Sequence, residues 1–179
     1  MELIENITAV FDRATQDEIE DGLFWYPRAH QIAREIAPTV EAGAGVIAAL
    51  SPMMPWDRNI MLAREAFATG VAQGGLSKNV AKAQAIIDGA DPLDVLGGDK
   101  VRTFYGNIVN PWGDGVTIDR HAYDIAVGKR HGNTRPGIGK KVYREFSTAY
   151  IEAALGLGVF PVELQAITWT VWRREIGVN

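Results

Sequence analysis

The chain has 179 residues and a hydrophobic content of 47%, which is enough to build the core of one domain. It contains no cysteine, which excludes disulfides, thiolate zinc sites, cysteine-ligated iron–sulfur clusters and cysteine nucleophiles. The formal net charge of −4, taken alone, argues against a nucleic-acid partner. The three histidines do not stand at metal-ligand spacing, and we expect neither a metal nor another cofactor.

No apolar run approaches the roughly 18 residues needed to cross a bilayer. The acidic N-terminus lacks the pattern of a signal peptide. We therefore expect a cytoplasmic protein with no membrane partner. Charged residues make up 22% of the chain, a composition typical of a soluble globular protein. The sequence carries no signal for an oligomeric state.

Helical periodicity dominates from the N-terminus onward, and no alternating strand pattern stands out. We expect a first helix over residues 6–20 and a second that begins at Pro27 and ends before Pro38. Residues 1–41 hold nine acids against three bases. We therefore expect a single all-α domain over 1–179, with acidic N-terminal helices over 1–38 and a core over about 40–174.

The middle of the chain carries clear helix boundaries. Thr39 is an N-cap residue before a helix over 40–50, whose alanines and glycines permit close packing. The prolines of the segment 51–55 end that helix and precede an amphipathic helix over 56–69. A further helix is expected over 78–88, with Ser77 as its N-cap. A short helical turn opens with Asp91 and Pro92 and ends at Gly97, and another helix follows over 99–109.

The last third of the chain is helical too, with one basic interruption. A loop over 111–115 precedes Asp119, which we expect to begin a helix that runs to about residue 127. A stretch with glycines and a proline over 128–139 separates it from helices over 140–155 and 161–174. The prediction is a compact all-α fold of roughly nine or ten helices, without repeats.

Charge is distributed unevenly along the chain. The segment Ile125–Arg144 holds six bases and no acid, so the remainder is strongly acidic. Such a chain can present a basic face to phosphates while it stays acidic overall. A solvated loop with incidental charge is the alternative. The six bases are Lys129, Arg130, Arg135, Lys140, Lys141 and Arg144.

Two residues that stand nineteen positions apart suggest catalysis. Lys100 follows the glycines of Leu96-Gly97-Gly98-Asp99 at the start of one helix, and Asp119 opens the next. An amine nucleophile that faces a carboxylate is suited to Schiff-base chemistry at a sugar carbon. We expect the two side chains to converge on one cleft.

The residues around this pair resemble the helix-hairpin-helix DNA glycosylase superfamily, small all-α proteins that process damaged or modified DNA bases. The family motif is Leu-Pro-Gly-x-Gly-x-Lys-x-Ala, followed by Val-Asp-x-His at a distance that Lys100-Val101 and Ile118–His121 reproduce. The segment Ala49–Asn59 resembles the family's Leu-Ser-x-Gln segment before a pocket helix, and Gln165–Trp169 falls at its last core helix.

The resemblance implies a glycosylase-like enzyme that acts on a base flipped out of double-stranded or locally opened DNA, with AP-lyase activity as a possible second step. Asp119 would stabilise the positive charge that develops on the sugar as the base leaves. Lys100 would displace the base as a neutral amine and form a Schiff base.

The other expected site residues fall into two groups. The candidates for the base pocket or the wedge are Met53, Trp56, Asn59, Trp112 and His121. The candidates for phosphate binding are the glycine-rich segments with their basic neighbours, namely Gly97, Gly98, Arg135, Gly137, Gly139, Lys140 and Lys141.

Structural roles are open for several of these residues. Lys100 could be an ordinary exposed helix lysine, and Asp119 could be an N-cap alone. His121 is expected to make a structural hydrogen bond more readily than to move protons. Asn59 could contact the pocket or pack between helices, and the second glycine segment could be a flexible loop before a helix.

Three alternatives to a glycosylase are open. The hairpin is shorter than the family's and carries Asp99 beside Lys100, and Met53 stands where the family has a glutamine. These departures fit a transferase on the same scaffold, of the kind proposed for some viral members, that adds a group to a modified pyrimidine. In that case Lys100 would hold a phosphate leaving group. A catalytically silent DNA-binding module and a helical adaptor for other proteins are the remaining alternatives.

Overall fold

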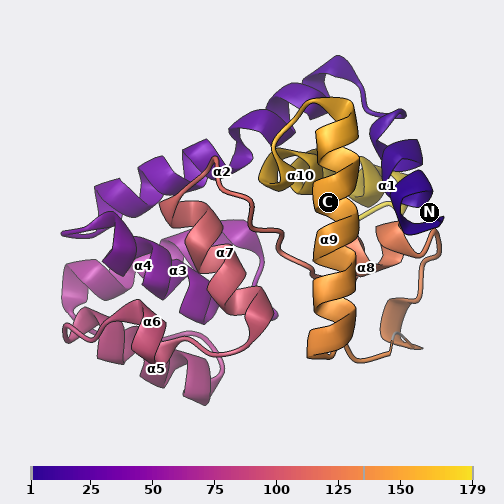
Figure 1. Ribbon diagram of the computed structural model, residues 1–179. Coiled ribbons are helices and arrows are strands. Elements are labelled where there is room, and N and C mark those ends of the chain that lie inside the picture. The colour runs from indigo at the N-terminus through magenta and orange to yellow at the C-terminus, as the bar shows by residue number, and fades with distance from the viewer. Residues whose placement is uncertain (1, 135, 179) are drawn as a thin grey trace. The chain divides into compact units, whose positions relative to one another are not determined.

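The computed structural model describes residues 2–134 and 136–178, and all regular structure in those ranges is helical (Figure 1). This confirms the all-α fold class. The helices are α1 Glu2–Phe11, α2 Gln16–Ile36, α3 Val40–Leu50, α4 Trp56–Thr69, α5 Ser77–Ile87, α6 Pro92–Val95, α7 Asp99–Val109, α8 Arg120–Ala126, a short 3-10 helix Gly132–Thr134, α9 Lys140–Leu157 and α10 Pro161–Glu175.

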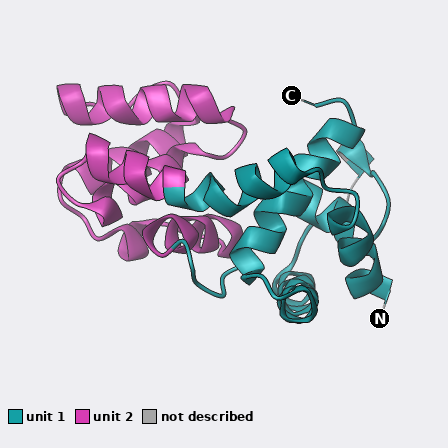
Figure 2. Cartoon of the chain, turned by 90° about the horizontal axis from the view of Figure 1, so that it is seen from above, with its two compact units in different colours: residues 1–27, 111–179 teal, residues 28–110 magenta. Residues whose placement is uncertain are grey.

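The chain forms two compact units, which are coloured separately in Figure 2. Unit 1 comprises residues 1–27 and 111–179, and unit 2 comprises residues 28–110. The boundaries fall at Pro27 and Pro111, whereas the sequence led us to expect a division near residue 38. That the whole chain is one domain stays a prediction, and each unit is described by itself.

Unit 1 is built around α8 and the C-terminal helices. α1 packs against α8, α9 and α10, because Ile7 and Val10 on its apolar stripe are buried in the core. Its acids Glu2 and Glu5 are not buried. The acidic N-terminal helix is therefore part of the core of unit 1. Other members of that core include Ile118, Ile125, Phe146, Tyr150, Leu164 and Val171.

The expected helix over 6–20 is in fact two helices, because α1 ends at Phe11 and α2 begins at Gln16. Thr15 and Glu18 explain the break. The backbone N–H of Glu18 donates to the Thr15 hydroxyl (3.3 Å), and the backbone N–H of Thr15 donates to the Glu18 carboxylate (2.9 Å). This is a reciprocal capping box, the Thr-x-x-Glu signal for a helix start.

A second difference concerns Pro27, which does not begin a helix but lies inside α2. Proline has no backbone N–H, so the carbonyl of Leu23 receives no helical hydrogen bond from that position. Proline is tolerated there at a cost, and the boundary between the two units falls at this residue.

Unit 2 has α3 at its centre, and α4, α5, α6 and α7 each pack against it. α3 is buried from Gly43 to Leu50. A Cβ at Gly43 would collide with the backbone of Ala33, so only glycine allows this approach. Thr39 caps α3 as expected, since its hydroxyl accepts the N–H of Ala42 (3.1 Å).

Most other predicted boundaries are confirmed. The bounds of α3, α4 and α7 are those expected from the sequence, and Asp91 caps α6 through the N–H of Leu93 (2.8 Å). The expected N-cap Ser77 is instead the first residue of α5, and Leu76 occupies the cap position without a side-chain hydrogen bond. α9 and α10 run to Leu157 and Glu175, slightly beyond the expected ends.

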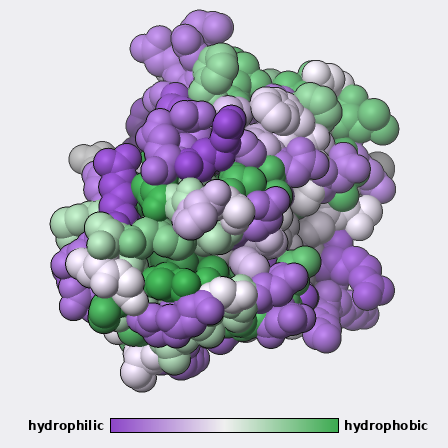
Figure 3. Space-filling view, turned by 90° about the vertical axis from the view of Figure 1, so that its left-hand side faces the viewer, coloured by the Kyte–Doolittle hydropathy of each residue, from purple (hydrophilic) through white to green (hydrophobic). Residues whose placement is uncertain are grey.

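Hydrophobic surface lies in patches between hydrophilic side chains on the side of the molecule that Figure 3 shows. In the described part of the chain, no single helix has the length and apolarity to cross a membrane. α9 and α10 together meet that test by length and composition, but they are bent by 97° at the turn between them.

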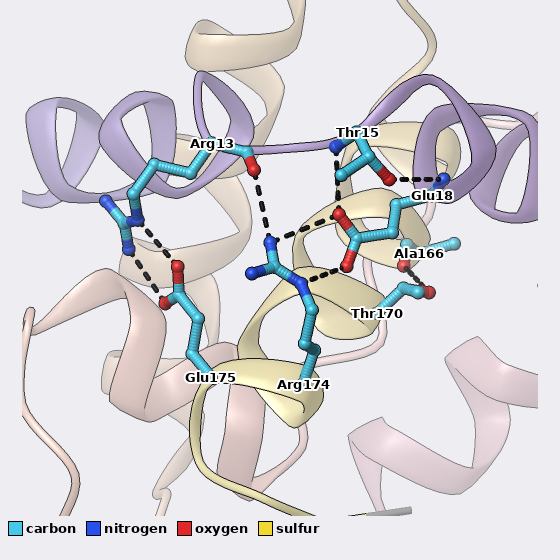
Figure 4. A network of polar contacts seen from close by, with 7 residues as sticks. All are labelled: Arg13, Thr15, Glu18, Ala166, Thr170, Arg174 and Glu175. Atoms are coloured by element: carbon cyan, nitrogen blue, oxygen red, sulfur yellow. Dashed lines mark hydrogen bonds and ion pairs between the residues drawn. The ribbon is translucent and has the colours of Figure 1, made fainter.

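The end of α10 is tied to the turn between α1 and α2 by two ion pairs (Figure 4). The guanidinium of Arg13 binds both carboxylate oxygens of Glu175 at 2.7 and 3.0 Å. Arg174 binds both oxygens of Glu18 at 2.6 and 3.2 Å and also donates to the carbonyl of Arg13. We call these four residues the paired cluster. Bidentate arginine–carboxylate pairs of this kind are geometrically specific.

Candidate functional site

Asp119 is placed by an extended segment whose backbone is fixed from α9. The Tyr143 hydroxyl donates to the carbonyl of Val116 (2.9 Å) and accepts the N–H of Ile118 (3.3 Å). Val116 and Ile118 are buried in the core of unit 1. This arrangement delivers Asp119 to the N-cap position of α8.

The Asp119 carboxylate uses both oxygens. Oδ1 accepts the backbone N–H groups of His121 (2.9 Å) and Ala122 (2.8 Å), which makes Asp119 the helix cap. Oδ2 accepts the indole N–H of Trp169, on α10, at 3.3 Å. These three N–H groups fix the orientation of the carboxylate, and the residue as a whole is partly exposed.

The tryptophan that binds this carboxylate contacts two other aromatic rings. Trp169 lies edge-to-face with Trp25, at 6.4 Å between ring centroids, and with His121 at 6.2 Å. The guanidinium carbon of Arg173 lies 4.3 Å from the centre of the Trp169 ring, a cation–π contact. Trp25 and Trp169 are partly exposed. Flat, half-exposed aromatic side chains can stack on a base.

His121 is almost buried, and its ring accepts a hydrogen bond. Arg120 donates through Nε to His121 Nε2 (3.3 Å), so the ring proton resides on Nδ1. Burial lowers the pKa of His121; the Asp119 carboxylate opposes this, and the charges of Arg120 and Arg173 reinforce it. His121 is therefore a neutral acceptor that orients Arg120, a structural hydrogen bond of the kind expected.

We call Asp119, Arg120, His121, Trp169 and Arg173 the Asp119 cluster. It holds two guanidinium groups and one carboxylate, with a neutral imidazole between them. Burial lowers the pKa of Arg173, the positive charge of Arg120 lowers it further, and the Asp119 carboxylate opposes both effects. With two guanidinium groups against one carboxylate, the cluster carries one positive charge in excess. In the part of the chain that the structure describes, no three histidine or acidic side chains gather to hold a metal ion.

Lys100 lies in unit 2, at the second position of α7, and is exposed. Gly98 is the N-cap of α7 and has φ of 81°, a backbone conformation that favours glycine. Gly97 and Gly98 are both exposed, and a Cβ on Gly97 would lie 3.7 Å from Lys82 Nζ. Since Asp119 belongs to unit 1, the expected convergence of Lys100 and Asp119 stays a prediction.

The second glycine-rich segment lies at the start of α9. Gly137, Gly139, Lys140 and Lys141 are all exposed, and no atom lies within 4 Å of a Cβ built on either glycine. Arg135 lies outside the described residues. Gly139 caps α9 without a side-chain hydrogen bond, so the first N–H groups of this helix have no side-chain cap.

The basic stretch before α9 is anchored where it leaves α8. The buried Asp124 carboxylate accepts the backbone N–H of His131 at 3.2 Å, and it lies 3.0 Å from His131 Nδ1. This contact fixes the position of His131 next to Lys129 and Arg130, which are exposed.

Met53 has the one positive φ found for a non-glycine residue in the described ranges, at 63°. It follows Pro52 in a turn closed by a hydrogen bond from the Met54 N–H to the Ser51 carbonyl (3.1 Å), and its residue surface is 89% exposed. This conformation is costly for a residue with a Cβ. A strained, exposed methionine suits a wedge, and that role stays a prediction.

The remaining pocket candidates differ in exposure. Trp112 is exposed in the loop before Val116, and Trp56 is partly buried at the start of α4. Asn59 is 1% exposed and donates through Nδ2 to the carbonyl of Ile47 (3.0 Å), while its Oδ1 has no hydrogen-bond partner. Asn59 thus ties α4 to α3, which corresponds to its helix-packing interpretation.

Of the residues expected in the site, the structure brings Asp119 and His121 together at the start of α8. The candidates that lie in unit 2 are described apart from them. Sequence reasoning missed Trp25, Arg120, Trp169 and Arg173. For two of them the sequence offered a signal: Trp169 stands four positions before Arg173 on one helix, and side chains with that spacing meet on one helix face.

The chain matches the family described as a family of unknown function, DUF7178, over residues 1–176, and it therefore belongs to that family. No curated protein and no solved structure matches the chain.

Proposed function

We propose that this protein is an enzyme that acts on a base extruded from DNA, in the manner of a DNA glycosylase, with Asp119 as its catalytic carboxylate. The observation that supports this most is the geometry of Asp119. Three N–H groups orient the carboxylate at the edge of a cluster that also offers aromatic faces and two arginines.

The chemistry follows from where charge develops. When a base leaves deoxyribose, positive charge accumulates at the anomeric carbon in an oxocarbenium-like transition state. A carboxylate that is already oriented stabilises that charge without reorganising during the reaction. Asp119 can also take a proton from an attacking water. The partly exposed ring of Trp25 suits the flat base that must leave the stack, since Arg173 already lies over Trp169.

Charge on unit 1 supports DNA as the partner. Lys140 and Lys141 are exposed in the first turn of α9, and Lys129 and Arg130 are exposed before it. Exposed lysines and arginines bind the phosphate backbone whatever its sequence, and such binding weakens steeply with salt. This is how a chain of net charge −4 can bind DNA.

The decisive test is Asp119→Asn, assayed by mass spectrometry of released bases and nucleosides on duplexes that carry damaged or modified bases. Asparagine also caps helices, so α8 should persist. Loss of the negative charge should reduce product formation about a thousandfold or more. Asp114→Asn, an exposed acid in the preceding loop, is the matched control. Equal activity of Asp119→Asn and wild type would overturn the proposal.

A second function is favoured by the exposure of Lys100. A lysine nucleophile usually lies in a site closed to water, whereas a lysine that binds a phosphate is often exposed. Lys100 is exposed, beside two exposed glycines. An exposed amine beside two glycines is open to the approach of a phosphate group. This exposure favours group transfer to a modified pyrimidine, with phosphate as the leaving group, over lyase chemistry.

Two assays separate these functions. Borohydride trapping on duplexes with abasic sites should give a covalent adduct that Lys100→Ala abolishes if Lys100 forms a Schiff base. The exposed Lys100 leads us to expect no adduct. Incubation with DNA that carries a phosphorylated hydroxymethyl pyrimidine and an amino donor should then yield a new nucleoside. A trapped adduct that depends on Lys100 would instead favour the lyase.

A further inference from the structure

Arg120 and Arg173, the two arginines of the Asp119 cluster, differ from Arg13 and Arg174 in their hydrogen-bond partners. Arg13 and Arg174 each bind a carboxylate with two hydrogen bonds. Among the described residues, neither Arg120 nor Arg173 forms an ion pair with a carboxylate. Arg173 stacks on Trp169, and Arg120 donates to the neutral ring of His121.

Both guanidinium groups are held in place by the same small set of side chains. The His121 ring, which accepts from Arg120, lies edge-to-face with the Trp169 ring that Arg173 covers. Trp169 in turn donates to Asp119. Asp119 accepts three N–H groups, and among the described residues it forms no ion pair with either arginine. The two guanidinium groups repel one another, and the single negative charge of Asp119 offsets only one of the two positive charges, so a second anion would stabilise the arrangement.

We propose that Arg120 and Arg173 form a phosphate subsite beside Asp119, which holds a phosphodiester of the DNA strand next to the extruded base. This inference rests on the proposed function, because it assigns the phosphate to the nucleotide on which Asp119 acts. The planar fork of a guanidinium matches two phosphate oxygens, and Arg120 also remains exposed toward solvent.

The connectivity of a nucleotide supports this location. The 5′ and 3′ phosphates of an extruded nucleotide are attached to the same deoxyribose whose anomeric carbon loses the base. An enzyme that directs a carboxylate at that carbon must accommodate a phosphate close by. Phosphate contacts of this kind fix the register of the strand without reading its sequence. The arginine pair would therefore position the sugar against Asp119.

The test is a double-mutant cycle on binding, with the full chain and a duplex that carries a tetrahydrofuran abasic analogue. Fluorescence anisotropy is measured for wild type, Arg120→Gln and Arg173→Gln. Each duplex is also made with one flanking phosphate replaced by an uncharged methylphosphonate. We expect each variant to bind about tenfold more weakly, with a salt dependence reduced by about one phosphate contact.

At the phosphate that the subsite holds, the loss of binding free energy caused by the methylphosphonate and the loss caused by an arginine substitution should not add, because each change removes the same contact. Arg64→Gln changes an exposed arginine of unit 2 and is the matched control. Its effect on the binding free energy should add to that of the methylphosphonate at every flanking phosphate. Arg173→Lys keeps the charge but loses the fork, and it should recover only part of the affinity. Thermal melting by circular dichroism checks that each variant is folded.

Free inorganic phosphate could occupy the same arginine subsite in place of a phosphodiester of DNA. If the cycle is additive at all flanking positions, while inorganic phosphate quenches tryptophan fluorescence in wild type but not in either variant, the subsite takes phosphate from outside the DNA strand. That result overturns the phosphodiester as the occupant. Additivity at all positions together with no effect of inorganic phosphate overturns the subsite itself.

These measurements need no catalysis, because the tetrahydrofuran analogue has no base to lose. The subsite is therefore tested separately from the proposed function. If Asp119→Asn retains full product formation, the proposed function fails whatever the arginines do. If Asp119→Asn abolishes product formation while the cycle is additive everywhere, the proposed function stands and the phosphodiester subsite fails.

Discussion

Arg173 and Arg174 are consecutive residues of α10, but their guanidinium groups have different contacts. Arg174 belongs to the paired cluster, where each guanidinium binds a carboxylate with two hydrogen bonds (Figure 4). Arg173 belongs to the Asp119 cluster, where it covers a tryptophan ring and has another arginine as neighbour. The same residue type at adjacent positions thus has a satisfied charge in one case and an unpaired charge in the other.

The difference indicates what each cluster is for. In the paired cluster the charges balance, so its contribution is to hold the α1–α2 turn against the end of α10. In the Asp119 cluster the charges do not balance, and the arrangement would be more stable with an anion bound. Unfavourable electrostatics at a partly exposed position is a common mark of a functional site.

The largest effect on stability should come from Glu18→Ala. This change removes both hydrogen bonds to Arg174 and the cap to the Thr15 N–H. We expect the free energy of unfolding to fall by roughly 2 kcal/mol, as measured by urea denaturation, with product formation at Asp119 retained. Glu20→Ala, an exposed neighbour, should leave stability unchanged. A similar loss in both variants would contradict the role given to the paired cluster.

Acid should weaken the same cluster. Hydrogen bonds from Arg174 and Arg13 hold the pKa values of Glu18 and Glu175 below the ordinary value of 4.5. Carboxyls with a lowered pKa in the folded state contribute stability above their unfolded pKa and lose that contribution as the pH falls through the folded pKa.

The free energy of unfolding should therefore decline as the pH falls below about 4.5. Urea denaturation at a series of pH values measures this decline. The double variant with Glu18→Gln and Glu175→Gln should show a shallower decline than wild type. An identical pH dependence in the double variant would show that other carboxyls are responsible.

Thr15→Ala should have a smaller effect of about 1 kcal/mol, because it removes one side of the capping box at the start of α2. Thr15→Ser keeps the hydroxyl and should lie close to wild type. Thermal melting of the two variants measures the difference. The comparison with Asp119→Asn is informative, since both residues are helix caps and only the Asp119 change should affect product formation.

The smallest effect concerns His121, and it is spectroscopic. Nitrogen-detected NMR of the ring should show a neutral imidazole protonated at Nδ1. Burial lowers the pKa of His121 below 6.5, so its contribution to stability is complete above that pH and is lost as the pH falls through the lowered value. Arg120→Gln removes the N–H donor to Nε2, so the ring proton should then be shared between Nδ1 and Nε2. An imidazolium at neutral pH would contradict the orienting role.

Much of the fold could be predicted because its boundaries are marked locally. Thr39 and the glycine at position 70 delimit α3 and α4 by capping chemistry, and the observed bounds agree with those expected. The predicted bounds of the first two helices were wrong because Pro27 suggested a helix start. The Thr15–Glu18 capping box instead starts α2 at Gln16, eleven residues before Pro27. Proline inside a helix is the less common case, and packing decides when it occurs.

The candidate site could be predicted only in part. Asp119 and His121 stand close together in the chain, so the helix start that they share is visible in the sequence. Trp169 is fifty positions from Asp119, and its hydrogen bond depends on how α10 packs beside α8. Periodicity identifies which face of α10 is apolar, but it does not identify the residue that the face meets.

Pro27 and Pro111 mark the two places where the chain passes between the units, and this has a consequence for folding. Residues 28–110 are one uninterrupted stretch, so unit 2 can collapse through loops that close within itself. Unit 1 must join an N-terminal segment to a C-terminal one across the whole of that insertion, at a greater cost in loop-closure entropy. During synthesis, residues 28–110 leave the ribosome before α8, α9 and α10. The apolar face of α1 therefore stays exposed until these three helices have been made and can bury it.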